Sequence, residues 1–185
     1  MTDLTSSPCA ADSAGARPFT GDPLDFAQVR RWREGERERL RAERKALPGP
    51  ARAAVTRAVI GHLDAFFADH VPDLTGRVIS GYWPIKNEPD LRDWFAALRE
   101  KGAVIALPVP ISPPQPMTFR LWEKDAKPVQ GFGNIPVPPE DAPQVTPGIL
   151  FAPLIGWDDR GFRLGYGAGY FDRTLAGFTE PALAL

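Results

Sequence analysis

The residues whose types could do chemistry are concentrated in one short stretch, RLGYGAGYFDR at positions 163–173. Its three glycines stand at alternate positions, namely Gly165, Gly167 and Gly169. Because glycine has no side chain, successive backbone amides in such a loop can converge into a concave site that binds an anion. The alternative interpretation is a tight turn in which the glycines only supply positive φ angles.

Charged side chains border this loop on both sides. Arg163 precedes it and Arg173 follows it, and each guanidinium could form charge-assisted hydrogen bonds with a phosphate group. Asp172 could hold a magnesium ion through its carboxylate oxygens, as nucleotide phosphates usually require. These residue types in this order favour a site for the phosphates of a nucleotide.

Two familiar nucleotide-binding templates do not fit the stretch. The dinucleotide fingerprint G-x-G-x-x-G needs a glycine where Tyr170 stands. It also follows a strand directly, whereas DDRGFR intervenes here after the apolar run. The P-loop pattern G-x-x-x-x-G-K-[ST] does not occur in the chain. The loop is therefore neither a dinucleotide fingerprint nor a P-loop.

A basic helix near the N-terminus is the second feature. Residues 30–45 contain eight basic and four acidic side chains. Arg33, Arg37, Arg41 and Lys45 are spaced four apart, which places them along one slowly drifting stripe of a helix. Such a helix is either a solvated element with Glu–Arg pairs or an electrostatic clamp for polyphosphate. Nucleic-acid binding is disfavoured, because aromatic residues hardly interleave the basic run and the formal net charge is -1.

The third feature is the segment YWPIKNEPD at positions 82–90. Trp83 comes at the end of a predicted strand, and Glu88 at the start of the next predicted helix. Ligands of open α/β sheets bind outside the carboxyl ends of the strands, so this segment lies where a site is expected. The alternative for Glu88 is a first-turn acid stabilised by the helix dipole. The sequence offers no nucleophile with an adjacent base, and no Cys/His cluster with metal-ligand spacing.

The elements that must position these residues alternate between helix and strand. Helical spacing and capping signals predict helices over residues 29–47, 50–70, 88–102 and 169–178. Apolar or alternating runs predict strands over residues 77–83, 103–110, 117–123 and 148–157, with 124–147 wrapping the surface. This order predicts an α/β layer fold with a mainly parallel sheet. The final PALAL looks like the beginning of another strand, which is either the start of a missing C-terminal piece or a terminal edge strand.

Length and composition predict one ordinary domain. The chain has 185 residues, of which 43% are hydrophobic and 24% charged. We expect a flexible tail over 1–24 and a single α/β domain over 25–185 that lacks its C-terminal strands. The single cysteine, Cys9, cannot form an internal disulfide, and the sequence shows neither a signal peptide nor an apolar run long enough to span a bilayer. A cytoplasmic location follows as an expectation.

Taken together, these features resemble the 5-formyltetrahydrofolate cyclo-ligase family, also called methenyltetrahydrofolate synthetases. The matching motifs run in the family's order from about residue 30 to residue 178. They are RKAL, YWPIKNEPD, ALPVP, MTFRLW, GFGNIPVPP and the long PLIGWDDRGFRLGYGAGYFDRTLAGF. The resemblance implies a three-layer α/β/α sandwich with a mainly parallel, Rossmann-like sheet that lacks the dinucleotide fingerprint. It also implies conversion of 5-formyltetrahydrofolate to 5,10-methenyltetrahydrofolate with ATP as co-substrate and Mg²⁺ as the metal.

The resemblance assigns roles to the matching positions. Arg33 and Arg37 match the basic pair that contacts ATP, with Arg41 or Arg44 as the alternatives in another register. The ATP-binding loop is Arg163, Leu164, Gly165, Tyr166, Gly167, Ala168, Gly169, Tyr170 and Phe171. The folate substrate would contact Trp83, Glu88, Tyr166, Gly167, Ala168, Gly169 and Tyr170. Tyr170 and Arg163 are the expected catalytic residues, and Asp172 the expected metal ligand.

The sequence departs from the family pattern at two loop positions. Phe171 stands where the family usually has a second tyrosine, and Ala168 where it often has glycine or lysine. A late aspartate that helps to bind magnesium in the family has no counterpart before residue 185. We expect small-molecule partners only, without nucleic acid or membrane, and a monomer or weak homodimer. The alternative function is a catalytically weak relative that binds nucleotide or folate as a regulatory module.

Overall fold

The computed structural model describes residues 15–112, 115–158, 160–178 and 183–184. The chain falls into two units. The first comprises Met1–Ala46 with Leu154–Gly167, and the second Leu47–Pro153 with Ala168–Leu185. The glycine loop therefore begins in the first unit and ends in the second. The expectation of one domain over 25–185 stays a prediction.

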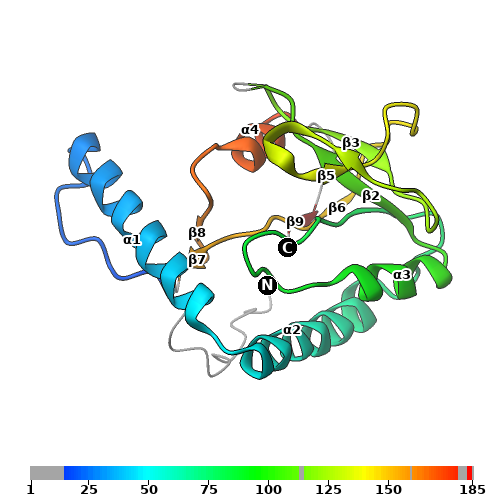
Figure 1. The fold of residues 1–185 in the computed structure, drawn as a ribbon, viewed down its shortest axis with the longest axis horizontal. Coiled ribbons are helices and arrows are strands. Elements are labelled where there is room, and N and C mark those ends of the chain that lie inside the picture. Colours follow the sequence, from blue (N-terminus) through cyan, green and yellow to red (C-terminus); the bar gives the residue numbers. More distant parts are fainter. Residues whose placement is uncertain (1–14, 113–114, 159, 179–182, 185) are drawn as a thin grey trace. The chain divides into compact units, whose positions relative to one another are not determined.

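A five-stranded sheet forms the centre of the second unit (Figure 1). Its order is β3-β2-β1-β6-β9. The strands are β1 (Val78–Ser80), β2 (Val104–Val109), β3 (Thr118–Leu121), β6 (Ile149–Leu150) and β9 (Leu183–Ala184). β1 pairs in parallel with β2 and β6, and β6 with β9, while only β3 is antiparallel to its neighbour. The predicted mainly parallel sheet is confirmed, and Leu183–Ala184 within the final PALAL form a strand.

Helices cover both faces of this sheet. They are α2 (Gly49–His70), α3 (Arg92–Glu100) and α4 (Tyr170–Ala176). Side chains alternate between the faces of a strand, so Ile79 packs with Phe67 of α2 and Phe95 of α3. On the opposite face Leu150 belongs to a cluster that includes Leu175 of α4. The three-layer α/β/α arrangement is confirmed, as Figure 1 shows with α2 and α3 on one side and α4 on the other.

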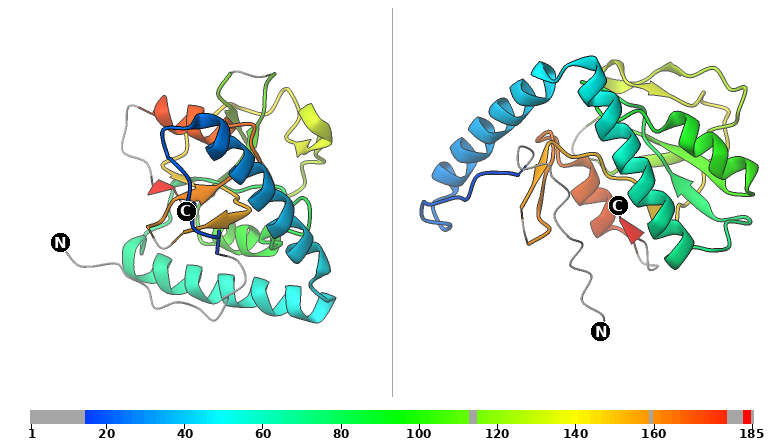
Figure 2. Two further views of the ribbon diagram at one scale, coloured as in Figure 1. Left: turned by 90° about the vertical axis from the view of Figure 1, so that its left-hand side faces the viewer. Right: turned by 90° about the horizontal axis from the view of Figure 1, so that it is seen from below.

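α2 and α3 run alongside each other under the sheet (Figure 2). The indole Nε1 of Trp94 donates a 2.8 Å hydrogen bond to Oδ1 of Asp64 on α2. Trp94 is only 6% exposed, and a buried indole N–H needs such an acceptor. This bond fixes the rotation of α3, and with it the position of the segment that enters α3. No helix in the described part of the chain is long and apolar enough to cross a bilayer.

The first unit consists of α1 (Phe26–Ala46) and a hairpin of β7 (Gly156–Trp157) and β8 (Arg163–Leu164). Their small core contains Leu40, Ile155 and Leu164.

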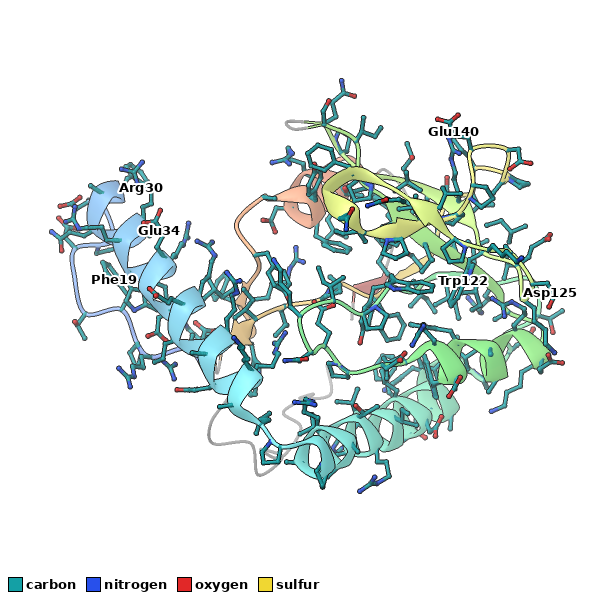
Figure 3. All side chains as sticks on the ribbon, viewed as in Figure 1. Phe19, Arg30, Glu34, Trp122, Asp125 and Glu140 are labelled. Atoms are coloured by element: carbon teal, nitrogen blue, oxygen red, sulfur yellow. The ribbon has the colours of Figure 1, made fainter. Side chains whose placement is uncertain are left out.

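The segment that precedes α1 packs against this helix. Phe19 lies beside Trp32, with ring centroids 5.7 Å apart, and is labelled in Figure 3. The buried carboxylate of Glu36 accepts hydrogen bonds from Arg39 and from the backbone N–H of Arg17. The Arg39 guanidinium, followed by that N–H, holds the pKa of Glu36 below its usual value against the opposing effect of burial. The ionised carboxylate thus anchors the chain before α1 to the helix.

The structure divides one predicted strand between two elements. The apolar run 148–157 gives β6 at its start and β7 at its end. Asp158 closes the turn after β7, because its Oδ1 accepts hydrogen bonds from the N–H groups of Arg160 and Phe162. Gly161 supplies the positive φ of 82° that this turn needs. Apolar periodicity missed the hairpin because the run is continuous in hydrophobicity.

Two other predicted boundaries also differ. β1 ends at Ser80 rather than at 83, and α3 begins at Arg92 rather than at 88. Residues between them include a turn in which Lys86 and Asn87 have positive φ angles. Oδ1 of Asp90 accepts a 3.1 Å hydrogen bond from the N–H of Arg92, where α3 begins. The segment 124–147, expected to wrap the surface, contains a short pair of strands, β4 (Val129–Gln130) and β5 (Pro136–Val137), around a 3₁₀ turn at Phe132–Asn134. It is not wholly at the surface, because Val137, Pro138 and Pro147 are buried.

Replacing Gly81 with alanine tests the packing at the end of β1. A Cβ at Gly81 would lie 2.8 Å from the ring of Phe95, which is fully buried. We expect Gly81→Ala to lower the free energy of unfolding by about 1–3 kcal/mol through overpacking, as measured by chemical denaturation. The matched control is Gly61→Ala at an exposed position of α2, where an added Cβ would have nothing within 4 Å. There, helix propensity predicts that the free energy of unfolding rises by up to about 1 kcal/mol. Equal stabilities of the two variants would contradict this packing.

Candidate functional site

One face of α1 is bound to the first half of the glycine loop and its preceding strand. Nε of Arg37 donates a 2.8 Å hydrogen bond to the carbonyl of Gly165. Leu40, one turn further on, is 3% exposed and packs into the core of the first unit.

Arg44 continues the same face of α1. Its Nη2 donates to the carbonyls of Leu154 and Ile155 at 2.8 and 3.1 Å, and its Nη1 to the hydroxyl of Tyr166 at 3.3 Å. Arg37, Leu40 and Arg44 follow an i, i+3, i+7 spacing, which defines one helix face. This face, rather than the full stripe of arginines four apart, meets the loop.

The other predicted basic residues of α1 lie elsewhere on its surface. Arg33 and Arg41 are exposed, whereas Arg37 and Arg44 are half-buried. Arg39 pairs with Glu36 and Glu43 at 2.7 Å each, so the helix also carries the predicted Glu–Arg pairs. The interpretation as a helix with Glu–Arg pairs is confirmed, and the electrostatic clamp for polyphosphate stays a prediction. The assignment of Arg33 and Arg37 to ATP, with Arg41 or Arg44 as alternatives, stays a prediction.

The three glycines of the loop differ in conformation. Gly167 and Gly169 have φ angles of +102° and +65°, which favour glycine over any other residue. A Cβ at Gly167 would also come 3.4 Å from Cζ of Arg37, so the backbone approaches the guanidinium closely. A Cβ at Gly165 would meet nothing within 4 Å. A turn with positive φ angles thus accounts for glycine at positions 167 and 169. At position 165, neither the backbone angle nor a close contact within the described residues requires glycine.

The second half of the loop leads into α4. Tyr170 is the first residue of that helix, and its hydroxyl donates a 2.6 Å hydrogen bond to the carbonyl of Ile111. Ile111 follows β2, which ends at Val109, so Tyr170 lies at the carboxyl edge of the parallel strands. That edge is where ligands of open α/β sheets bind. Within this unit, the structure brings Tyr170 to the place that the sequence argument gave to the site.

Glu88 lies in a turn beyond the carboxyl end of β1. Its N–H donates to the carbonyl of Ile85 at 3.0 Å, and its Oε2 accepts from the N–H of Ile85 at 2.9 Å. Between them, Lys86 and Asn87 have φ angles of 50° and 62°, the pattern of a type I′ turn. Glu88 is only 9% exposed and precedes α3 by several residues, so its interpretation as a first-turn acid is wrong. Non-glycine residues in this conformation concentrate at functional sites.

Trp83 is held from two directions. Its ring lies 5.9 Å from that of Trp122 in a T-shaped arrangement, and the guanidinium of Arg92 lies 4.9 Å above it. Arg92 is itself paired with Asp90 at 2.6 Å. The hydrogen bonds from Arg92 hold the pKa of Asp90 below its usual value. The orientation of the Trp83 ring is therefore set by the protein.

The residues present can be compared with the chemistry of ATP and Mg²⁺. Half-buried arginine on α1 and a glycine backbone without Cβ atoms fit a polyanion, because they combine positive charge with close approach of the backbone. Asp172 is an exposed carboxylate in the first turn of α4. Among the residues that the structure describes, no three His, Cys, Asp or Glu side chains gather as a metal site. One carboxylate fits Mg²⁺ that is held mainly by phosphates and water.

The other predicted residues of the ATP-binding loop lie in β8 and α4. Arg163 and Leu164 form β8, and Phe171 lies in α4 beside Tyr170. The sequence suggested that the Arg173 guanidinium pairs with a phosphate. In the structure, its Nη2 donates a 2.7 Å hydrogen bond to the carbonyl of Ala168. Sequence reasoning also gave no role to the turn at Lys86 and Asn87, although asparagine is a residue type that accepts positive φ.

The chain thus combines a mainly parallel α/β sheet with a glycine loop that fits neither of the familiar nucleotide fingerprints. Comparison with known families identifies it further. The model of the 5-formyltetrahydrofolate cyclo-ligase family matches residues 29–183, and the chain belongs to this family of ligases. This confirms the resemblance that the sequence motifs indicated.

Individual relatives agree with this assignment. The chain is 30% identical over 146 residues to a 5-formyltetrahydrofolate cyclo-ligase of Mycolicibacterium smegmatis. The matched region covers 75% of this chain and 72% of the relative. The fold is similar to that of a 5,10-methenyltetrahydrofolate synthetase from Mycoplasma pneumoniae, with a TM-score of 0.64 and 22% identity over 81% of this chain and 80% of that one. The synthetase from Aquifex aeolicus gives a TM-score of 0.64 and 23% identity over 83% of this chain and 76% of that one.

Truncating Arg44 tests whether it braces the chain before the glycine loop. We expect Arg44→Met to lower the free energy of unfolding by about 1–3 kcal/mol, because the carbonyls of Leu154 and Ile155 lose a charged donor. The matched control is Arg41→Met on the exposed face of α1, which should change it by less than about 0.5 kcal/mol. Chemical denaturation of both variants measures the difference. Equal effects would mean that the contacts of Arg44 do not stabilise the unit.

Proposed function

We propose that the chain is a 5-formyltetrahydrofolate cyclo-ligase that depends on ATP and Mg²⁺. Its products would be 5,10-methenyltetrahydrofolate, ADP and inorganic phosphate. The observation that carries the proposal is the family match over residues 29–183, which includes the whole glycine loop and the basic helix. The alternative is a catalytically weak relative that binds the same ligands as a regulatory module.

The reaction has a chemical obstacle that ATP removes. The formyl oxygen of the substrate is a poor leaving group, so N10 cannot close the ring directly. That oxygen attacks the γ-phosphorus of ATP and ADP leaves, which gives an iminium phosphate. N10 then attacks the formyl carbon, loses its proton, and the carbon–oxygen bond breaks as phosphate departs. The protein mainly positions the reactants and stabilises charge, which agrees with the lack of a nucleophile–base pair in the sequence.

Arginines and the loop backbone would bind ATP. We assign Arg33, Arg37 and the segment 163–171 to this role, with Arg163 and Tyr170 as the catalytic residues. The half-buried Arg37 supports the assignment, because it already lies within hydrogen-bond distance of the loop. Asp172 would hold Mg²⁺, whose chemical contribution is to neutralise charge on the phosphates.

Trp83, Glu88 and the segment 166–170 would bind the folate. The carboxylate of Glu88 is 9% exposed and could accept the N–H donors of a pterin, because a carboxylate can accept more than one hydrogen bond. Trp83 offers an aromatic surface whose orientation is set by Trp122 and Arg92. Small-molecule partners, a cytoplasmic location and a monomer or weak homodimer remain predictions.

The proposal is tested by incubating the purified chain with 5-formyltetrahydrofolate and Mg-ATP and following the absorbance of 5,10-methenyltetrahydrofolate. Product should appear only when both ATP and Mg²⁺ are present, and Asp172→Asn should need more Mg²⁺ for the same rate. Absence of ATP-dependent product at high protein concentration would contradict the ligase function. Calorimetric binding of ATP or folate in that case would support the regulatory alternative.

Replacing Glu88 separates its role toward folate from its role in the turn. Glu88→Gln keeps an oxygen that can accept from the N–H of Ile85 but removes the charge, and Glu88→Ala removes both. We expect Glu88→Gln to raise KM for 5-formyltetrahydrofolate by roughly tenfold while KM for ATP changes less than about twofold. Glu100→Ala, at an exposed ion pair with Lys124, is the control. A larger change in KM for ATP than for folate would refute the assignment.

A further inference from the structure

We propose that Arg173 is a positioning residue that holds the second half of the glycine loop, Ala168 to Tyr170, in its ligand-binding conformation. The inference rests on the proposed function for the identity of the ligands, but its structural basis lies wholly within the second unit. The sequence suggested instead that the Arg173 guanidinium pairs with a phosphate. The contacts of the guanidinium point to the loop backbone and the Tyr170 ring.

Arg173 contacts three consecutive residues of the loop. Its Nη2 donates a 2.7 Å hydrogen bond to the carbonyl of Ala168. Its backbone N–H donates to the carbonyl of Gly169 at 3.1 Å. Its Cζ lies 5.3 Å from the ring centroid of Tyr170, within the range of a cation–π interaction. The contacts with Ala168 and Tyr170 belong to the side chain, whereas the bond to Gly169 is a backbone bond at the start of α4.

Gly169 leaves space for this guanidinium because it has no Cβ. Its φ angle of +65° is left-handed, and a Cβ built on it would lie 2.8 Å from Nη1 of Arg173. The backbone angle favours glycine at this position, and a Cβ there would require the guanidinium to shift. The guanidinium rests against the bare backbone of the residue that it helps to position.

The Nε of Arg173 is the one part of this arrangement that disfavours it. This atom is buried, and the described residues provide it with no hydrogen-bond acceptor. A buried N–H without a partner is unfavourable. The side chain nevertheless lies over the loop, where it contacts Ala168 and Tyr170.

Arg173 completes the anchoring of Tyr170. The hydroxyl of Tyr170 is bound to the carbonyl of Ile111, and its own carbonyl accepts a 2.7 Å hydrogen bond from Oγ1 of Thr174. That Oγ1 in turn accepts from the N–H of Met117. These contacts fix the hydroxyl and the backbone of Tyr170, and Arg173 fixes the face of its ring. The role of Arg173 is therefore exerted through Ala168, Gly169 and Tyr170 rather than by contact with substrate.

The test compares Arg173→Met, which removes the donors, with Arg173→Lys, which keeps the charge. In the free protein, hydrogen–deuterium exchange should quicken in peptides spanning 168–174 for Arg173→Met. The turnover kcat should fall on the order of 10- to 100-fold, because a misplaced loop misaligns the reactants. Arg173→Lys should recover part of both effects. The melting temperature of each variant is measured to show that the loss is local.

Arg160→Met is the matched control. Arg160 also lies over an aromatic ring, at 5.2 Å from Phe162, and pairs with Asp158, but it belongs to the exposed β7–β8 turn. Neither the exchange of 168–174 nor kcat should change in this variant. The same loss of kcat in Arg160→Met as in Arg173→Met would overturn the proposal.

The outcomes separate this inference from the proposed function. Unchanged exchange and kcat in Arg173→Met would overturn the positioning role while the ligase function stands. A higher KM for Mg-ATP without faster exchange would mean that Arg173 pairs with phosphate directly, and this also overturns it. Faster exchange in a protein whose wild type gives no product would support the positioning of the loop and contradict the ligase function.

Discussion

The carbonyl groups of an irregular loop must find hydrogen-bond donors, and in this protein arginine side chains supply them. A loop whose glycines adopt left-handed angles cannot continue a sheet or a helix, so its backbone has no regular partners. In the first unit, Arg37 donates to the carbonyl of Gly165. In the second unit, Arg173 donates to the carbonyl of Ala168. Each half of the glycine loop thus has a backbone carbonyl bound by a guanidinium group of its own unit.

The same requirement explains the local chemistry of the site. Guanidinium groups that satisfy loop carbonyls also concentrate positive charge beside a backbone that lacks Cβ atoms, which is the environment that a phosphate group needs. Arg44 extends the arrangement to Leu154 and Ile155 at the start of the hairpin. The arginines that bind loop carbonyls are thus also placed where the proposed function needs positive charge. This placement suits a ligase whose main task is to position reactants and stabilise charge.

The parallel sheet supplies a second, independent set of positions. Because parallel strands end at one edge, the segments after β1 and β2 both emerge there. The turn at Lys86 and Asn87 holds Glu88 after β1, and the carbonyl of Ile111 after β2 holds Tyr170. In both cases the hydrogen bond uses a backbone group that lies beyond the end of the strand, namely the N–H of Ile85 and the carbonyl of Ile111. The proposed folate-binding residues Glu88 and Tyr170 are thus each held by a backbone group just beyond the end of a parallel strand.

The sequence by itself determined the class of the fold, the motifs and the family. Apolar runs and helical spacing are local properties, so the mainly parallel sheet and the helices α1 to α4 could be predicted from them. Local spacing also identified the glycine loop and excluded two templates. It misplaced the start of α3 and missed the β7–β8 hairpin, because turn conformation at Asn87 and Asp158 depends on hydrogen bonds that hydrophobicity does not encode.

Only the tertiary structure decided which arginines meet the loop. The stripe of arginines on α1 is defined by helical geometry alone, whereas the choice of Arg37 and Arg44 depends on where Leu40 packs in the core of its unit. The position of the Arg173 guanidinium over the loop also depends on Gly169, because a Cβ there would lie 2.8 Å from Nη1. A sequence states the charge of each side chain, but the carbonyls that Arg37 and Arg44 bind lie 128 and 110 residues away in the chain, so only packing could select them.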